Sequence, residues 1–297
     1  MTAIDPRITA GVDGSAGARA AVAWAARIAS LRHLELKIAH GLRVAGRYYG
    51  GGLSGAGAET LFDAIRADGE RAVADARALA AAVDRDLTIT SQVHNDPPVP
   101  ALIDESRHAR LLVVAHTGAG GFTGMLVGGT AASVAAHAHC PVAVVRGRHG
   151  ATAVPEAGPV AVGIDGSPNS EPAIAVAFEE ASLRGVPLVA VHAWTDTTAE
   201  DPRGPTRPEA GEAAEDRLLT QRLAGRPEKY PDVGIRRVLV RDRPRHALLD
   251  VSAEAQLVVV GSRGRGGFTG MVLGSTSQAL VQHARCPVLV VRPQRKG

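Results

Sequence analysis

The stretch that decides the fold is LVVVGSRGRGGFTGMVLGST, residues 257–276. It opens with four apolar residues without polar alternation, which is typical of a strand buried on both faces of a parallel sheet. A glycine-rich segment, 261–270, follows, and a helix is expected to begin near Ser275. Ligands of open parallel sheets bind outside the carboxyl ends of the strands. A buried strand followed by glycines and then a helix therefore indicates a ligand site.

The chain contains this stretch twice. Residues 115–130 are identical to residues 261–276 at nine of sixteen positions, and the GVDGS of residues 11–15 returns as GIDGS at residues 163–167. The copies are 152 residues apart in the GVDGS pair and 146 residues apart in the glycine-rich pair. The first half therefore carries six extra residues between these motifs. A repeat of this length predicts two domains of one fold.

The boundary between the two copies is expected in a segment rich in Gly, Ala and Pro, residues 147–159, which has the composition of a linker. We predict domains at residues 1–152 and 153–297. The six extra residues of the first half are placed in the glycine-rich loop around residues 47–52.

Short apolar runs alternate with amphipathic stretches in each half, the pattern of a parallel sheet covered by helices. After Ser167, an N-cap followed by proline, residues 173–182 are helix formers; in the first half Ser15 begins the equivalent helix, with Trp24 and Ile28 in its buried stripe. Each half is predicted to be a doubly wound, Rossmann-like or flavodoxin-like α/β domain with five parallel strands. The strands expected in the second half are 160–164, 188–191, 235–240, 257–260 and 288–291.

Composition excludes several classes of protein. The 297 residues are 45% hydrophobic and 21% charged, as in ordinary globular domains. Two cysteines cannot build a disulfide scaffold, and Cys140 and Cys286, each before a proline, are expected to be small buried residues. The first residues lack the pattern of a signal peptide and no run reaches about 18 apolar residues, so we expect a cytoplasmic protein without a membrane segment.

Charge and motif content exclude further functions. A net charge of +3 with 3% aromatic residues gives little basis for nucleic-acid binding. None of the three lysines follows a glycine-rich loop, so there is no Walker loop. No Gly-x-Gly-x-x-Gly follows the first strand of either half, which argues against a dinucleotide-dependent oxidoreductase.

Two sets of residues are candidates for ligand contact. Asp13 and Asp165 follow the first strand of each half, where a carboxylate accepts hydrogen bonds from a ligand amino group or hydroxyl, or alternatively supports the turn and the helix dipole. Recurrence in both halves favours the ligand. In the glycine-rich segment, exposed N–H groups and the following helix terminus form an anion cradle, to which hydroxyls and Arg263 or Arg265 add donors.

The spacing Gly261-x2-Gly264-x9-Gly274-Ser275, together with the Asp165 motif, resembles the nucleotide-binding signature of the universal stress protein family. The resemblance covers almost the whole chain, twice, as in the tandem members found in mycobacteria and related actinobacteria. It implies strand order 3-2-1-4-5 and ATP, with or without magnesium, between the ends of strands one and four. It also implies that Asp165 meets the adenine, that the glycines and Ser275 surround ribose and phosphates, and that Asp196 borders the nucleotide.

The first half departs from this signature. Asp13, Gly118 and Gly128 keep it, but Ala115 replaces the first glycine and Gly129 replaces the serine, for which the hydroxyl of Thr130 could substitute. We expect both halves to bind, with the second half as the better match. The predicted nucleotide-binding residues are Gly11, Asp13, Gly14, Ser15, Ala115, Gly118, Gly120, Gly128, Gly129 and Thr130 in the first half, and Gly163, Asp165, Gly166, Ser167, Asp196, Gly261, Ser262, Arg263, Gly264, Arg265, Gly266, Gly267, Gly274, Ser275 and Thr276 in the second.

Three classes of function are candidates for this chain. The family resemblance implies a non-catalytic adenine-nucleotide sensor that regulates stress response and growth through an unidentified protein partner. The alternative is an enzyme, either a slow ATPase or a relative of adenylating α/β enzymes, but GIDGS does not reproduce the Ser-Gly-Gly-x-Asp-Ser loop of the latter and no general base is repeated beside the predicted phosphates. The third class, the oxidoreductase, lacks its glycine motif.

The histidines, the absence of a metal site and the fifth strands give three further expectations. His40 and His192, at the end of the second strand of each half, are expected to bond to backbone, and no metal site is expected because His137, His139 and Cys140 are not a repeated set. The apolar fifth strands of the two halves are expected to pair as a pseudo-dimer within the chain, as in related family members, with a homodimer also open.

Overall fold

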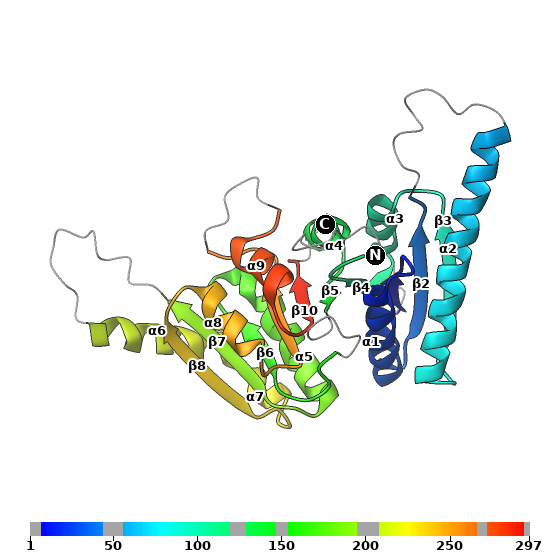
Figure 1. The fold of residues 1–297 in the computed structure, drawn as a ribbon. Coiled ribbons are helices and arrows are strands. Elements are labelled where there is room, and N and C mark those ends of the chain that lie inside the picture. The colour runs from blue at the N-terminus through cyan, green and yellow to red at the C-terminus, as the bar shows by residue number, and fades with distance from the viewer. Residues whose placement is uncertain are drawn as a thin grey trace, which may run out of the picture. The chain divides into compact units, whose positions relative to one another are not determined.

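The computed structural model describes residues 7–43, 56–118, 129–146, 154–194, 208–265 and 272–293. The chain divides into two compact units, Met1–Val154 and Pro155–Gly297 (Figure 1).

The first unit is a parallel sheet with helices between its strands. Its strands follow the order β3-β2-β1-β4-β5, and each neighbouring pair is parallel. This is the predicted order 3-2-1-4-5. The elements are β1 (Arg7–Gly11), α1 (Ala16–Arg32), β2 (Glu35–Gly41), α2 (Ala56–Val83), β3 (Ile89–His94), α3 (Pro98–Glu105), β4 (Ala109–Ala115), α4 (Gly129–His137) and β5 (Val142–Val145).

The second unit repeats the topology, with β8, β7, β6, β9 and β10 in the places of β3, β2, β1, β4 and β5. The predicted doubly wound α/β fold is confirmed for both units. The elements are β6 (Val160–Gly163), the 3-10 turn η3 (Pro168–Ser170), α5 (Glu171–Arg184), β7 (Leu188–Trp194), α6 (Pro208–Leu223), α7 (Arg226–Lys229), β8 (Ile235–Arg241), α8 (Pro244–Val251), β9 (Leu257–Gly261), α9 (Ser275–His283) and β10 (Val288–Val291).

Burial explains why these segments form central strands. All four residues of β5 and all four of β10 are buried, as are the first four residues of β9. Apolar side chains on both faces of a strand are removed from water by helices on each side, which stabilises the sheet by about 25 cal/mol for each Å² of apolar surface. Trp24 and Ile28 of α1 are buried, as their positions in the amphipathic stripe predicted.

The helices after β1 and β6 begin differently. Ser15 is the N-cap of α1 and its side chain accepts a hydrogen bond from the N–H of Ala18. Ser167 caps only the 3-10 turn η3, and its side chain makes no capping bond because its hydroxyl donates to the Asp165 carboxylate. The predicted N-cap role of Ser167 is therefore wrong for α5, which begins at Glu171.

Both cysteines are buried, as predicted, and neither forms a disulfide. Burial raises the pKa of the Cys140 thiol to about 12, because the thiolate would lose its hydration inside the unit. Among the described helices, none combines the length and the apolar character needed to cross a bilayer. The pairing of the two fifth strands and the domain boundary at residue 152 stay predictions.

A hydrogen bond joins the end of α1 to the residue after α2, where Ser30 Oγ donates to Asp84 Oδ2 at 2.6 Å. This bond, followed by one from the Asp86 N–H, lowers the pKa of the Asp84 carboxyl. We expect Ser30→Ala to raise the pKa of Asp84 toward its ordinary value, measured by NMR titration of the carboxyl carbon. Because the folded pKa is depressed, the contribution of Asp84 to stability is present above its unfolded pKa and is lost as the pH falls through the folded one. An unchanged Asp84 titration in the variant would contradict this reading.

Candidate functional site

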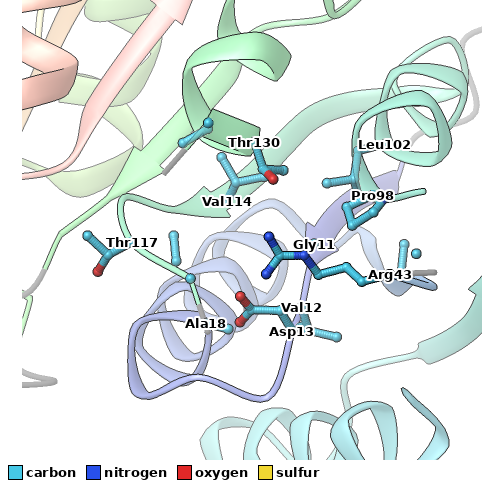
Figure 2. A pocket seen from close by; sticks show the side chains of 16 residues that line it. Gly11, Val12, Asp13, Ala18, Arg43, Pro98, Leu102, Val114, Thr117 and Thr130 are labelled. Carbon is cyan, nitrogen blue, oxygen red and sulfur yellow. The ribbon is translucent and has the colours of Figure 1, made fainter. Parts of the chain in front are cut away.

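A cavity of about 290 Å³ opens in the first unit at the carboxyl ends of β1 and β4 (Figure 2). This is the edge of the sheet at which a doubly wound fold binds its ligand. The residues that line it come from the ends of β1, β2 and β4 and from the beginnings of α1, α3 and α4: Gly11, Val12, Asp13, Ala18, Ala39, Gly41, Arg43, Pro98, Leu102, Val114, Ala115, Thr117, Gly118, Gly129, Thr130 and Ala131.

The Asp13 carboxylate supports the turn before α1 and also lines the cavity. Its Oδ1 accepts a hydrogen bond from the N–H of Ser15 at 3.1 Å, which supports the turn before α1. Gly14 in this turn has φ +78°, a left-handed conformation that favours glycine. Asp13 also lines the cavity, and a Cβ atom at Gly118 would overlap its Oδ2. Glycine at 118 therefore lets the backbone approach the carboxylate directly.

One end of the cavity is suited to an anion. Gly129 and Thr130 line it there, and α4 begins at Gly129. The first N–H groups of a helix have no partner within the helix, and the helix dipole places partial positive charge at that end. A Cβ atom at Gly129 would have no heavy atom within 4 Å, so this position opens onto free space.

The opposite end of the cavity is formed by residues that the motifs did not predict. Gly41 is the last residue of β2, and Arg43 lies just beyond that strand. Pro98 and Leu102 belong to the first turns of α3. Figure 2 shows the Arg43 side chain reaching into the cavity, with its guanidinium toward the Asp13 carboxylate. The strand order could have revealed this wall, because it places the end of strand two, and the helix that connects strands three and four, beside strand one.

The second unit brings together the corresponding motifs. Asp165 Oδ1 accepts hydrogen bonds from the N–H and the hydroxyl of Ser167 at 2.9 and 2.8 Å. A Cβ atom at Gly264 would lie 2.8 Å from Asp165 Oδ2, which repeats the arrangement of Gly118 and Asp13. The aspartate and the glycine segment thus meet in both units.

The start of α9 is held against the end of β9. The N–H of Gly274 donates to the carbonyl of Ser262 at 2.8 Å, and Ser277 Oγ donates to the carbonyl of Gly261 at 2.6 Å. A Cβ atom at Gly274 would lie 3.5 Å from Arg263 Cα. These contacts place Ser275 and Thr276, the first residues of α9, beside the glycine-rich segment.

In the second unit, the structure brings together Asp165, residues 261–265 and residues 274–276, as the contacts above show. The other predicted site residues fall into three groups. Six line the first-unit cavity, namely Gly11, Asp13, Ala115, Gly118, Gly129 and Thr130. Gly14, Ser15, Gly166 and Ser167 form the turns that carry the aspartates, while Gly163 packs at the end of β6, where a Cβ atom would lie 2.8 Å from Leu248. Gly120, Gly128, Asp196, Gly266 and Gly267 lie outside the described residues.

A second cavity, of about 110 Å³, lies in the second unit away from these motifs. It is lined by Trp194, Glu212, Leu239 and Arg241, and the Arg241 guanidinium lies over the Trp194 ring at 5.7 Å. Within the part of the chain that the structure describes, no three His, Cys, Asp or Glu side chains are grouped as metal ligands.

The two histidines at the ends of β2 and β7 bond to backbone, as predicted. His40 Nδ1 lies 2.8 Å from the carbonyl of Val12, and His192 Nδ1 lies 2.6 Å from the carbonyl of Ile164. Each histidine thereby links the second strand of its unit to the residue that precedes the aspartate. His192 has a second partner, Glu215, which the sequence did not predict.

Comparison with known proteins gives consistent matches over both units. The family model described as the universal stress protein family matches residues 6–146 and 157–292. Universal stress protein Rv2005c of Mycobacterium tuberculosis is 42% identical over 288 residues, 96% of each chain, and a universal stress protein of Mycolicibacterium smegmatis is 41% identical over 303 residues, 99% of each chain. The fold is also similar to a solved universal stress protein of Archaeoglobus fulgidus, with TM-score 0.71 and 18% identity over 97% of this chain and 98% of that one.

Proposed function

The chain belongs to the universal stress protein family, in two tandem copies, and from that membership we propose that each half binds an adenine nucleotide. The nucleotide we propose is ATP, with or without magnesium. The bound state would regulate the contacts of the chain with a protein partner in stress response and growth, so the function is sensing and not turnover.

The observation that carries this proposal is the first-unit cavity between the ends of β1 and β4. It joins an apolar wall, Pro98 and Leu102, to an anion-binding end at the start of α4. An adenine ring fits the first environment and phosphates fit the second. The cavity volume of about 290 Å³ lies at the lower limit of small-molecule sites, about 300–1,000 Å³.

The Asp13 carboxylate supplies an acceptor between these two ends. A carboxylate can accept hydrogen bonds from the adenine amino group or a ribose hydroxyl, and it repels phosphate. We therefore propose that the phosphates bind beside Gly129 and Thr130 at the start of α4, away from this carboxylate. The Arg43 guanidinium, which faces Asp13, offsets the negative charge of the carboxylate.

Identification of the natural ligand is the first test. Freshly purified protein would be denatured and any released nucleotide identified by mass spectrometry, and calorimetric titration of nucleotide-free protein with ATP would give the number of sites. We expect two sites for each chain. No released nucleotide together with no heat of ATP binding would refute the proposal.

Hydrolysis separates the sensor from the enzyme alternative. Phosphate release would be measured against bound ATP over time. A sensor keeps ATP intact over many dissociation events, whereas turnover faster than about one per second, within the usual range of enzymes, would establish catalysis.

Substitutions of one glycine in each half should separate the two sites. A Cβ atom at position 118 or 264 would meet the carboxylate of Asp13 or Asp165, so Gly118→Ala and Gly264→Ala should each displace that carboxylate. Loss of one charged hydrogen bond to the ligand predicts about tenfold weaker ATP binding at the affected site alone. Neither glycine has a positive φ, so backbone strain is not involved.

The matched control is Gly234→Ala, where a Cβ atom would have no heavy atom within 4 Å. We expect both calorimetric sites to keep their affinity in this variant. Equal weakening of both sites by Gly118→Ala would contradict the assignment of one nucleotide to each half.

A further inference from the structure

A chain of polar contacts runs from the interior of the second unit to its glycine-rich segment. His192 is buried, with 1% of its side chain exposed, and its Nε2 lies 2.7 Å from Glu215 Oε2 of α6. The same Glu215 oxygen lies 3.8 Å from Arg265 Nη2. Since His192 Nδ1 also bonds to the carbonyl of Ile164, the residue before Asp165, the chain begins and ends beside the predicted ligand site.

Arg265 lies directly over the turn that carries Asp165. A Cβ atom at Gly166 would overlap Arg265 Nη2 and would lie 2.5 Å from Leu218 Cδ2. Gly166 has φ +75°, so only glycine allows both this turn and this approach. Half of the Arg265 side chain remains exposed, which leaves its guanidinium accessible to a ligand.

The first unit has a histidine at the corresponding position but neither the glutamate nor the arginine of this chain of contacts. His40 bonds to the carbonyl of Val12, and Gly69 lies against its ring, where a Cβ atom would be 3.0 Å from Nε2. With the repeat spacing of 146 residues, Gly69 occupies the place of Glu215, and Ala119 occupies the place of Arg265. The contact chain is therefore a property of the second half.

We propose that Glu215 is a positioning residue of the second-half site, which with His192 holds Arg265 over the Asp165 turn as a cation for a phosphate group of the ligand. This inference rests on the proposed nucleotide binding and deepens it. An arginine already held by an acid loses less side-chain entropy on binding than a free one. The second half would thus distinguish ATP from adenosine more strongly than the first half does.

The test uses the full chain with Gly118→Ala, which weakens the first-half site so that the second is titrated. In this background Glu215→Gln should weaken ATP binding about three- to tenfold, the effect of freeing one long side chain, and should leave adenosine binding within about twofold. Arg265→Ala should weaken ATP binding at least as much, and the double variant should lose no more than Arg265→Ala alone, because Glu215 acts through Arg265.

The matched control is Glu228→Gln on α7, an exposed glutamate at a distance from this chain of contacts, which should leave ATP binding unchanged. No ATP binding by the Gly118→Ala chain would refute nucleotide binding by the second half itself. ATP binding that Glu215→Gln leaves unchanged, or an equal loss of ATP and adenosine affinity, would overturn the positioning role alone. Arg265→Ala keeps the test decisive if Glu215→Gln does not fold, because Arg265 is half exposed.

Discussion

Replacement of Glu105 by alanine is expected to lower the free energy of unfolding of the first unit by about 3–5 kcal/mol, the usual cost of removing one partner from a buried ion pair. Glu105 ends α3 and is 4% exposed. Its Oε1 lies 2.6 Å from Lys37 Nζ and 3.0 Å from His94 Nε2, and its Oε2 lies 3.4 Å from Arg7 Nη2. Without this carboxylate, the mostly buried Lys37 and Arg7 side chains would lose the anion that they share.

The second unit suggests how the loss can be rescued. At the positions that correspond to Lys37, His94 and Glu105 by the repeat spacing, it carries Val189, Val240 and Val251. Well-packed apolar residues often replace a buried ion pair at no cost. The triple variant Lys37→Val, His94→Val, Glu105→Val should therefore be more stable than Glu105→Ala alone.

Urea unfolding followed by tryptophan fluorescence, in a chain that also carries Trp194→Phe, would measure this effect. Trp24 in α1 is then the one tryptophan left, so its fluorescence reports on the first unit. The surface control is Glu70→Ala, whose ion pair with Arg66 is largely exposed and should contribute only about 0.3–0.5 kcal/mol. A loss for Glu105→Ala no larger than that of the control would show that the four-residue charge cluster does not stabilise the unit.

Gly158→Ala is expected to lower the free energy of unfolding of the second unit by about 2–5 kcal/mol, the sum of backbone strain and overpacking. Gly158 has φ +108°, and a Cβ atom there would overlap the backbone carbonyl oxygen of Glu254. Its own carbonyl accepts a hydrogen bond from Gln256 Nε2 at 2.7 Å, and Gln256 is bonded in turn to Arg184. The backbone before β6 therefore cannot move away without breaking this link to α5.

Two other glycines allow the cost of the left-handed backbone conformation to be measured apart from the cost of steric overlap. Gly185 has φ +63° and no heavy atom within 4 Å of an added Cβ, so Gly185→Ala should cost only the left-handed conformation, about 1–2 kcal/mol. Gly234 has neither a positive φ nor a neighbour, so Gly234→Ala should be close to neutral. Thermal unfolding of the three variants should rank them in this order, and a Gly158 variant as stable as the Gly234 variant would contradict it.

The sequence predicted the sheet well because its strands are short apolar runs without alternation. The expected strand 288–291 matches β10 exactly in extent, and 160–164 matches β6 to within one residue. The strand predicted at 188–191 is shorter than the observed one, because β7 continues to Trp194. The strand ends at the carboxyl edge of the sheet carry polar and aromatic side chains. A prediction based on runs of apolar residues therefore ends the strand before them.

The site was only partly predictable for a different reason. Asp13 and Gly118 belong to repeated motifs, so recurrence revealed them. Arg43 and Pro98 belong to segments without a repeated pattern, and their position in the cavity depends on the strand order. Glu215 was missed because α6 reaches His192 only through the tertiary packing of the second unit.

The covalent joining of two unequal units has a consequence for how such a molecule can evolve. A symmetric dimer of one short chain receives every substitution in both subunits at once, so a change that suits one site is imposed on the other. Here the charge cluster around Glu105 occurs in one unit, and the link from His192 to Arg265 occurs in the other. Each copy of the gene segment can accumulate its own changes, so the two units can diverge in sequence and in contacts within one inherited molecule.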